Sequence, residues 1–204
     1  MDIAVQLVRA YLQANGYFTV TEYPIIEAMA GGGYRAITDV DILAVRLPGA
    51  GRVIWKEGES AAEQRRLFDP DPCLLDDGAD DRTDFIIAEV KEGRAEVNRG
   101  GRNPNTIIAA LRRFAFIEPS KAETVADKLL QRGAVDIDAA RVRLFAFGSR
   151  HPEHRGPWKV VLLKDCVDYL MRGKREHGDL VSASQLKDPA LGMLALLSKA
   201  GSLK

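Results

Sequence analysis

Two short segments of this chain combine the pattern of a buried strand with charged side chains, and they constrain the fold more than any other feature. The first carries Asp39 and Asp41 ahead of an apolar run, and the second is an apolar run that ends in Glu89 and Lys91. Alternate residues of a strand point to the same face of a sheet, so the members of each pair share a face. Because an unpaired charge in a sheet core is very costly, we expect these four groups to lie together.

Length and composition predict one domain with a substantial core and a small appendage. The chain has 204 residues, of which 46% are hydrophobic. No apolar run approaches the roughly 20 residues of a membrane-spanning helix, and the N-terminal residues lack the basic and apolar regions of a secretory signal. The two cysteines, Cys73 and Cys166, form neither a disulfide framework nor a metal-ligand spacing, and free thiols are typical of a reducing compartment. We therefore expect a cytoplasmic protein without a membrane partner.

The charges are balanced overall but unevenly distributed. The net charge is zero, from 29 basic and 29 acidic residues, which argues against binding to nucleic acid through bulk charge alone. Residues 69–84 carry seven Asp and one Arg, whereas residues 94–113 carry five Arg and one Glu. The basic block follows Lys91 directly and would form a phosphate-facing surface; two solvated faces of opposite sign are the alternative. The arginines of the block are Arg94, Arg99, Arg102, Arg112 and Arg113.

Hydrophobic periodicity and turn residues predict alternating helices and strands. Helices are predicted at residues 2–14, from Asn103 onward, from a capping box at Ser120 to Gly133, at residues 165–171, and from Asp188 to Gly201. Strands are predicted at residues 17–23, ended by Pro24, and at residues 37–47, 85–91, 141–147 and 158–163. Residues 52–83 are interpreted as an insertion with a short helix at residues 60–68 and exposed acidic residues at 76–81. Mixed strands flanked by helices imply an α/β core.

The charged groups have the chemistry of a magnesium site. Mg²⁺ prefers oxygen ligands and keeps several waters, so the carboxylates of Asp41 and Glu89 would suffice to hold Mg²⁺ or Mn²⁺, and the carbonyl of Val90 would add a third oxygen. Lys91 would lie beside an attacking water, where it would orient that water or offset developing charge, and a nearby metal would lower its pKa. A divalent ion so held is suited to hydrolysis of phosphodiester bonds.

This pattern resembles the PD-(D/E)xK nuclease superfamily, which includes many restriction enzymes and archaeal Holliday-junction resolvases. The strand with Asp41 is similar to the family's metal-binding strand, and Glu89-Val90-Lys91 matches its Glu-x-Lys motif. The order of helix, three strands, helix and strand over roughly residues 2–148 is also similar. The resemblance implies a restriction-endonuclease-like fold, with a central mixed β-sheet flanked by helices, and a Mg²⁺-dependent endonuclease that acts on DNA.

The resemblance also implies roles for particular residues. Asp41 corresponds to the metal-binding aspartate, and Asp39, two residues earlier on the same face, would assist it. Two positions depart from the family pattern. Val40 precedes Asp41 where the family name has proline, and the first helix carries Gln6 where many members have a glutamate.

The predicted domain organisation is a nuclease-like core at residues 1–163, with an acidic insertion at about residues 50–83, and a helical extension at residues 164–204 that packs on the core. A second interpretation keeps the nuclease fold but assigns it to binding of nucleic acid or a protein partner, with weak or no cleavage. A third is a structural domain, in which Asp41 and Lys91 form an ion pair. The sequence leaves open the preferred DNA structure, the pathway and the oligomeric state, although a homodimer would supply two sites for cutting both strands.

Asp39 has a simpler alternative. It could lie at a strand edge and pair with Arg35 or Arg46, without any role in metal binding. The two histidines at His151 and His154 are interpreted as the tip of a polar turn between strands, and no Ser or Cys nucleophile with a partner base is evident.

Overall fold

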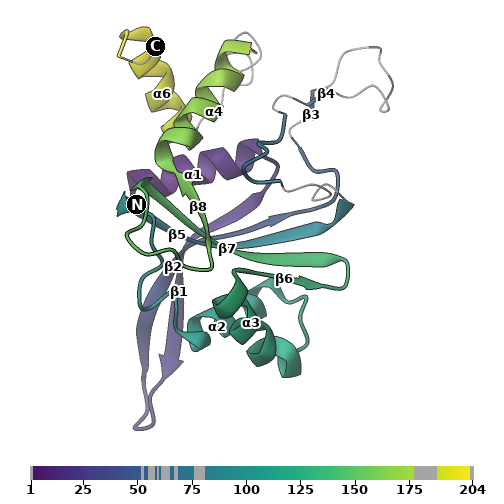
Figure 1. Ribbon diagram of the computed structural model, residues 1–204, viewed down its shortest axis with the longest axis vertical. Coiled ribbons are helices and arrows are strands. Elements are labelled where there is room, and N and C mark those ends of the chain that lie inside the picture. Colours follow the sequence, from purple (N-terminus) through teal and green to yellow (C-terminus); the bar gives the residue numbers. More distant parts are fainter. Residues whose placement is uncertain are drawn as a thin grey trace.

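The computed structural model shows an α/β protein built on one six-stranded mixed sheet (Figure 1). Five α-helices lie in the part of the chain that the structure describes. The described residues are 2–51, 53–54, 58, 60, 65–66, 69–75, 81–176 and 188–202.

The sheet has the strand order β1-β2-β5-β7-β6. Strands β6 and β8 pair with the same edge of β7, β6 with residues 140–143 and β8 with residues 145–148. The pairs β1–β2, β2–β5 and β6–β7 are antiparallel, whereas β5–β7 and β7–β8 are parallel. The strands are β1 (Phe18–Ala28), β2 (Tyr34–Arg46), β5 (Thr83–Arg94), β6 (Ala134–Ile137), β7 (Ala140–Arg150) and β8 (Lys159–Leu162). A separate two-stranded sheet joins β3 (Val53–Ile54) to β4 (Arg65–Arg66).

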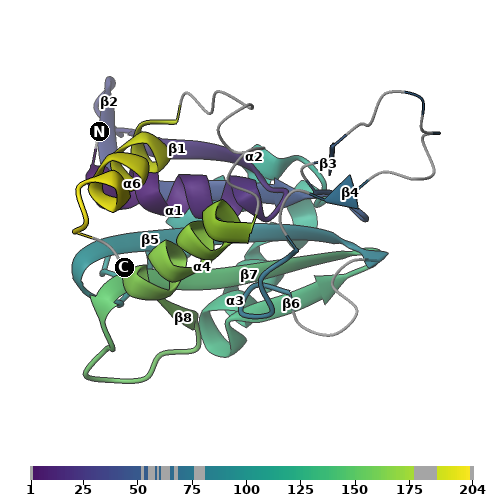
Figure 2. The same ribbon diagram turned by 90° about the horizontal axis from the view of Figure 1, so that it is seen from above.

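Helices cover both faces of the sheet (Figure 2). One face packs against α1 (Ile3–Ala14), α4 (Leu163–Glu176) and α6 (Pro189–Lys199). The other packs against α2 (Pro104–Phe114) and α3 (Ala122–Arg132), which follows the short 3₁₀ turn η3 (Pro119–Lys121). None of the helices in the described part of the chain is long and apolar enough to cross a membrane.

The alternation of β5 decides which face carries the charged residues. Ile86 and Ala88 belong to the core on the α1 side, and Phe85 and Ile87 belong to the core on the α2 side. Because successive strand residues alternate between faces, the side chains of Glu89 and Lys91 also point to the α2 side of the sheet. The motif therefore emerges beside the N-terminal end of α2, where the chain leaves β5.

A buried polar network holds the opposite end of β5. Asp84, 1% exposed, accepts a hydrogen bond from Nε of Arg143 at 2.8 Å and another from the hydroxyl of Tyr17 at 2.5 Å. Arg143, 3% exposed, also donates to the carbonyl of Leu74 at 2.7 Å. Buried charges need such partners, so this network fixes the N-terminal end of β5 to its neighbours.

The helix predicted at residues 2–14 is confirmed, and its start follows from capping. Asp2 is the N-cap and accepts from the backbone N–H of Ala4 at 2.7 Å. The helix predicted from Asn103 is confirmed in the same way, because that side chain accepts from the N–H of Asn105 at 3.0 Å. The α/β class is also confirmed.

Two local predictions are wrong, and one strand was not predicted. Pro24 does not end the first strand, because β1 is an edge strand and tolerates a residue without an N–H. The capping box at Ser120 is absent, since Lys121 takes the N-cap position without a side-chain hydrogen bond. Strand β6 was not predicted, because four residues, of which three are half-buried and one is exposed, carry too little periodicity to be recognised.

The insertion is only partly described. Within the helix predicted at residues 60–68, Arg65–Arg66 forms strand β4, and most of the remaining residues lie outside the described part of the chain. The acidic residues 76–80 also lie outside it, so their predicted exposure stays a prediction. The two helices predicted near the C-terminus are present as α4 and α6, and both pack against α1.

Candidate active site

The candidate site lies where β2 and β5 stop pairing. The last backbone pair of that ladder is Ile42 with Ala88. Just beyond it, Oδ2 of Asp41 accepts a hydrogen bond from the backbone N–H of Val90 at 2.7 Å. The carboxylate thus takes the place of a strand carbonyl, which fixes Asp41 against β5.

The structure brings Asp41, Glu89 and Lys91 together. Nζ of Lys91 forms an ion pair with Oε1 of Glu89 and lies 4.0 Å from Oδ2 of Asp41. The side chain of Glu89 is 6% exposed, that of Asp41 21% and that of Lys91 39%. The lysine therefore lies on the same side of the sheet as both carboxylates, as the alternation of β5 predicts.

Asn98 was not recognised from the sequence, and it is the main additional residue of the site. Its Nδ2 donates to Oε1 of Glu89 at 2.5 Å, and its Oδ1 accepts from the backbone N–H of Gly101 at 2.7 Å. The amide thereby ties the carboxylate to the loop that leads into α2. An Asn three residues before a Gly, directly after a strand, is a signal for a side-chain-stabilised turn that could have identified it.

Two glycines let that loop approach the site closely. A Cβ on Gly101 would lie 3.0 Å from Oε2 of Glu89 and 2.8 Å from Cγ1 of Val97. A Cβ on Gly100 would lie 2.8 Å from Oγ1 of Thr38, which precedes Asp41 by three residues in β2. The backbone of this loop therefore forms one wall of the site.

The electrostatics favour binding of a cation. Burial raises the pKa of Asp41 above 3.8, although the Val90 N–H and the charge of Lys91 oppose it. Burial also raises the pKa of Glu89 above 4.5, with Asp41 adding to the effect and Lys91 and Asn98 opposing it. Two partly desolvated carboxylates side by side gain from any positive charge placed between them.

Lys91 is held in its charged form. Burial lowers the pKa of Lys91. The hydrogen bond and the charge of Glu89, together with the charges of Asp41 and Asp2, raise it by more, so the pKa lies above 10.5. The protein groups alone therefore raise the pKa of Lys91, whereas the lowered pKa predicted from the sequence depends on a nearby metal ion. Among these protein groups, Lys91 acts as a cation and hydrogen-bond donor.

The start of α1 contributes one acidic group, Asp2, and a buried amide, Gln6, near the site. The charge of Asp2 raises the pKa of both Asp41 and Lys91, which places the N-cap of α1 close to them. Gln6 follows one turn later, since its N–H donates to the carbonyl of Asp2 at 3.1 Å. Its side chain is 4% exposed, and neither amide atom has a hydrogen-bond partner among the described residues.

Glu22 of β1 has a strained backbone beside the site. It lies opposite Asp41, between the pairs Thr21–Ile42 and Tyr23–Val40, and its φ is +52°. That left-handed conformation is rare for a residue with a side chain and costs on the order of 1–3 kcal/mol. Oε1 of Glu22 accepts from the N–H of Asp2 at 3.4 Å, so the strained residue contacts the start of α1.

Asp39 is exposed and lies beside Asp41, whose pKa its charge helps to raise. The two ion pairs considered for it are not formed. Arg35 pairs with Glu27 at 2.7 Å, and Arg46 is buried and donates to the carbonyls of Asn15 and Ala50. The ion pair considered between Asp41 and Lys91 is at the 4.0 Å limit, and Glu89 is the closer partner of the lysine.

The basic block does not form one surface. Arg99 and Arg102 are exposed on the loop beside Asn98. Arg94 pairs with Glu153 at 2.5 Å. The other two arginines, Arg112 and Arg113, lie in the last turn of α2, roughly 12 to 14 Å along the helix from its start.

Arg113 lies over the edge strand β1, in a groove that runs toward the end of the sheet opposite the candidate site. Its guanidinium lies 5.8 Å from the centre of the Tyr23 ring, and it lines a groove with Phe18, Thr83 and Phe85. Phe85 precedes Lys91 by roughly 20 Å of extended strand. Arg99 and Arg102 therefore lie on the loop beside the candidate site, whereas Arg113 lines a different groove, over β1 and β2.

The donor set fits a hard divalent ion better than a softer ion that prefers nitrogen or sulfur ligands, such as Zn²⁺ or Cu²⁺. Within the described ranges, no group of three or more His, Cys, Asp or Glu side chains could hold a metal alone. Two carboxylates supplemented by waters suit Mg²⁺ or Mn²⁺. The N–H of Val90 is used by Asp41, while the carbonyl of Val90 stays a predicted ligand. His151 and His154 are exposed in the turn between β7 and β8.

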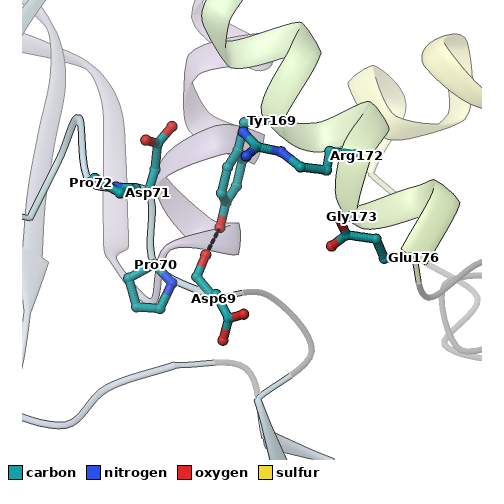
Figure 3. A pocket seen from close by; sticks show the side chains of 8 residues that line it. All are labelled: Asp69, Pro70, Asp71, Pro72, Tyr169, Arg172, Gly173 and Glu176. Atoms are coloured by element: carbon teal, nitrogen blue, oxygen red, sulfur yellow. Dashed lines mark hydrogen bonds between the residues drawn. The ribbon is translucent and has the colours of Figure 1, made fainter.

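A separate hollow of about 300 Å³ lies between α4 and residues 69–72 (Figure 3). The hydroxyl of Tyr169 donates to the carbonyl of Asp69 at 2.9 Å, and the guanidinium of Arg172 lies 5.9 Å from the centre of the Tyr169 ring. Asp71 accepts from the hydroxyl of Tyr11 at 2.8 Å and from the N–H of Cys73 at 2.9 Å. None of the predicted site residues lines this hollow, and its buried aspartate serves the core.

Comparison with known proteins adds no relative to this picture. The chain matches no protein-family model, no curated protein and no solved structure.

Proposed function

We propose that the protein is a Mg²⁺-dependent endonuclease that hydrolyses phosphodiester bonds of DNA, with a restriction-endonuclease-like fold of the PD-(D/E)xK type. The observation that carries the proposal is the convergence of Asp41, Glu89 and Lys91 at the point where β2 and β5 separate. Partly buried charged groups lose hydration, so they stabilise the sheet no more than apolar residues in the same positions would. Such an arrangement is typical of a functional site.

The order of elements supports the same proposal. One helix, three antiparallel strands, a helix pair and a strand parallel to the third follow each other along the chain. The Asp strand and the Glu-x-Lys strand are neighbours in that sheet. The resemblance implies a helix, three strands, one helix and a strand. That order is present here with a second helix, α3, and the short strand β6 added before β7, and with β3 and β4 between β2 and β5.

The proposed mechanism assigns one task to each group. Asp41 and Glu89 would hold a divalent ion, which would polarise the scissile phosphate and lower the pKa of a water bound to it. The Val90 N–H keeps Asp41 in place, and Asn98 keeps Glu89 in place. Lys91 would donate to the attacking water or to a phosphate oxygen and offset the developing negative charge.

The deciding experiment is cleavage of supercoiled plasmid DNA. We expect nicking or cutting with Mg²⁺ or Mn²⁺, none after addition of EDTA, and none in Asp41→Asn. Asp127→Asn is the matched control, because Asp127 is exposed on α3, which packs on the core. Cleavage that survives Asp41→Asn, in a preparation free of contaminating nuclease, would assign the chemistry to other residues.

A binding module without efficient cleavage is the second candidate. The buried amide of Gln6 favours it, because a neutral side chain on α1 adds no charge for a second metal ion. The balanced net charge also leans toward it. DNA binding in a mobility-shift assay, combined with no cleavage under any divalent ion, would select this candidate.

Sedimentation velocity would test the predicted homodimer.

A further inference from the structure

A hollow of about 390 Å³ adjoins the candidate site. It lies between the loop that precedes α2, the end of α3, and the turn between β7 and β8. Its volume falls within the range of small-ligand pockets, roughly 300–1,000 Å³. The residues that line it are Val97, Arg102, Leu130, Leu144, His154, Arg155, Gly156, Pro157 and Trp158.

The hollow and the candidate site share walls. Val97 and Leu144 line both this hollow and a small cavity of about 10 Å³ that Glu89 also lines. Arg102 directly follows Gly101, whose N–H holds Asn98 beside Glu89. A strand of DNA with its scissile phosphate at Asp41 and Glu89 would therefore pass the mouth of the hollow.

The lining has two chemical sides. One is apolar and aromatic, dominated by the indole ring of Trp158, whose Nε1–H has no hydrogen-bond acceptor among the described residues. The other carries the guanidinium groups of Arg102 and Arg155 and the imidazole of His154. Neither arginine has an ion-pair partner in the described part of the chain, and no acidic residue lines the hollow.

The turn that carries Trp158 is held firmly. Gly156 lacks a side chain where a Cβ would lie 2.2 Å from Cη2 of the indole, so the ring packs directly on the turn backbone. Gly133, at the end of α3, has a φ of +74°, and a Cβ there would collide with the carbonyl of Pro157. The indole is thus positioned before any ligand arrives, which reduces the entropy lost on binding.

We infer that this hollow binds one unpaired base of a DNA strand, with Trp158 as the stacking surface and Arg102 and Arg155 on the flanking phosphates. Aromatic rings stack on any base, and guanidinium groups bind phosphates in a planar fork. A paired base is not available to such a hollow, because it is stacked inside the duplex. The inference rests on the proposed function and narrows the substrate to DNA with an unpaired nucleotide beside the cut.

The test uses the fluorescence of Trp158. The chain has two tryptophans, so Trp55→Phe leaves this one alone. In EDTA, which prevents cleavage, we would titrate this protein with an eight-nucleotide oligo-dT, an abasic strand of equal length and a blunt eight-base-pair duplex. We expect saturable quenching by oligo-dT, no quenching by the abasic strand or the duplex, and binding of the abasic strand weakened by about tenfold or more.

Arg155→Ala provides a second readout that does not disturb the indole. We expect weaker binding of oligo-dT and a log–log salt slope flatter by about 0.7 for one lost contact to a single strand. Arg175→Ala is the matched control, because Arg175 is exposed in the last turn of α4 on the other side of the sheet, and it should change neither quantity.

Equal binding of oligo-dT and the abasic strand, quenching by the duplex, or no change in Trp158 fluorescence would each overturn the inference. Failure of the inference is distinct from failure of the proposed function. A protein that cleaves DNA with Mg²⁺ but shows no quenching refutes only the base-binding hollow. Quenching by oligo-dT without cleavage refutes the nuclease and retains the hollow.

Discussion

Asp41 and Val90 are joined by a hydrogen bond from a backbone N–H to a carboxylate, across the gap where β2 and β5 cease to pair. The acceptor precedes the last paired residue of one strand, and the donor stands between the Glu and Lys of the motif on the other. This bond aligns the two halves of the candidate site, which lie far apart in the sequence.

Lys91→Ala should lower the rate of DNA cleavage by about 10² to 10³-fold, the usual loss when one preorganised hydrogen-bond donor to developing charge is removed. The reason is that Nζ of Lys91 forms an ion pair with Glu89 and lies 4.0 Å from Oδ2 of Asp41, beside the expected position of the attacking water. Single-turnover cleavage at saturating Mg²⁺ measures the effect. Lys164→Ala, which removes an exposed helix lysine paired with Asp168, should leave the rate unchanged. Equal rates for both variants would contradict the role of Lys91.

Divalent ions should raise the thermal midpoint of the wild-type protein at pH 7.5, because only the folded state holds Asp41 and Glu89 together. The pKa values of both carboxylates are raised by burial above 3.8 and 4.5. Their contribution to metal-free stability is therefore present at low pH and lost as the pH rises through the folded pKa values. The metal shift should do the opposite and disappear in acid.

Differential scanning fluorimetry with and without Mn²⁺, at pH values from 4 to 8, measures this dependence. Glu89→Gln should abolish the shift at every pH, whereas Glu123→Gln, an exposed position in the first turn of α3, should retain it. A shift of the same size in Glu89→Gln would place the bound ion elsewhere.

Gly101→Ala should reduce cleavage and weaken metal binding. Its Cβ would lie 3.0 Å from Oε2 of Glu89 and 2.8 Å from Cγ1 of Val97, so both side chains would have to shift. Gly93→Ala is a matched control nearby in β5, because a Cβ there has no atom within 4 Å. Isothermal titration with Mn²⁺ and cleavage kinetics compare the two. Normal metal affinity in Gly101→Ala would show that Glu89 is not a ligand.

The two groups of arginines should differ in their contribution to DNA binding. Arg99→Ala with Arg102→Ala should weaken binding uniformly across sequences and flatten the salt slope for duplex DNA by about 0.9 per lost phosphate contact. Arg112→Ala with Arg113→Ala removes the same charge from the last turn of α2 and should have the smaller effect. Fluorescence anisotropy at several salt concentrations, without metal, gives both slopes. Identical slopes for the two double variants would mean that only bulk charge matters.

The buried network at the far end of β5 should be a major source of stability. Asp84→Asn leaves Arg143 without its buried partner and should lower the free energy of unfolding by about 3–5 kcal/mol. Asp136→Asn removes an exposed partner of Arg82, 3.0 Å away, and should cost less than about 1 kcal/mol. Urea unfolding followed by circular dichroism compares them. A small effect of Asp84→Asn would mean that the arginine regains hydration.

The sequence alone determined the features that depend on local order. Apolar residues at helical spacing fixed α1, Asn103 before Pro104 fixed the start of α2, and the period of two placed Glu89 and Lys91 on one face of β5. These follow from backbone geometry and capping, which act within a few residues.

Tertiary structure alone decided which of these groups meet. The bond from Val90 to Asp41 spans 49 positions, and the amide of Asn98 reaches Glu89 only because Gly101 lets the loop close on it. The same packing separates Arg113 from Arg102, although both belong to one basic block in the sequence. Contacts of this kind depend on sheet register and on how α2 crosses the sheet, and these are set by the burial of two cores rather than by neighbours in the chain.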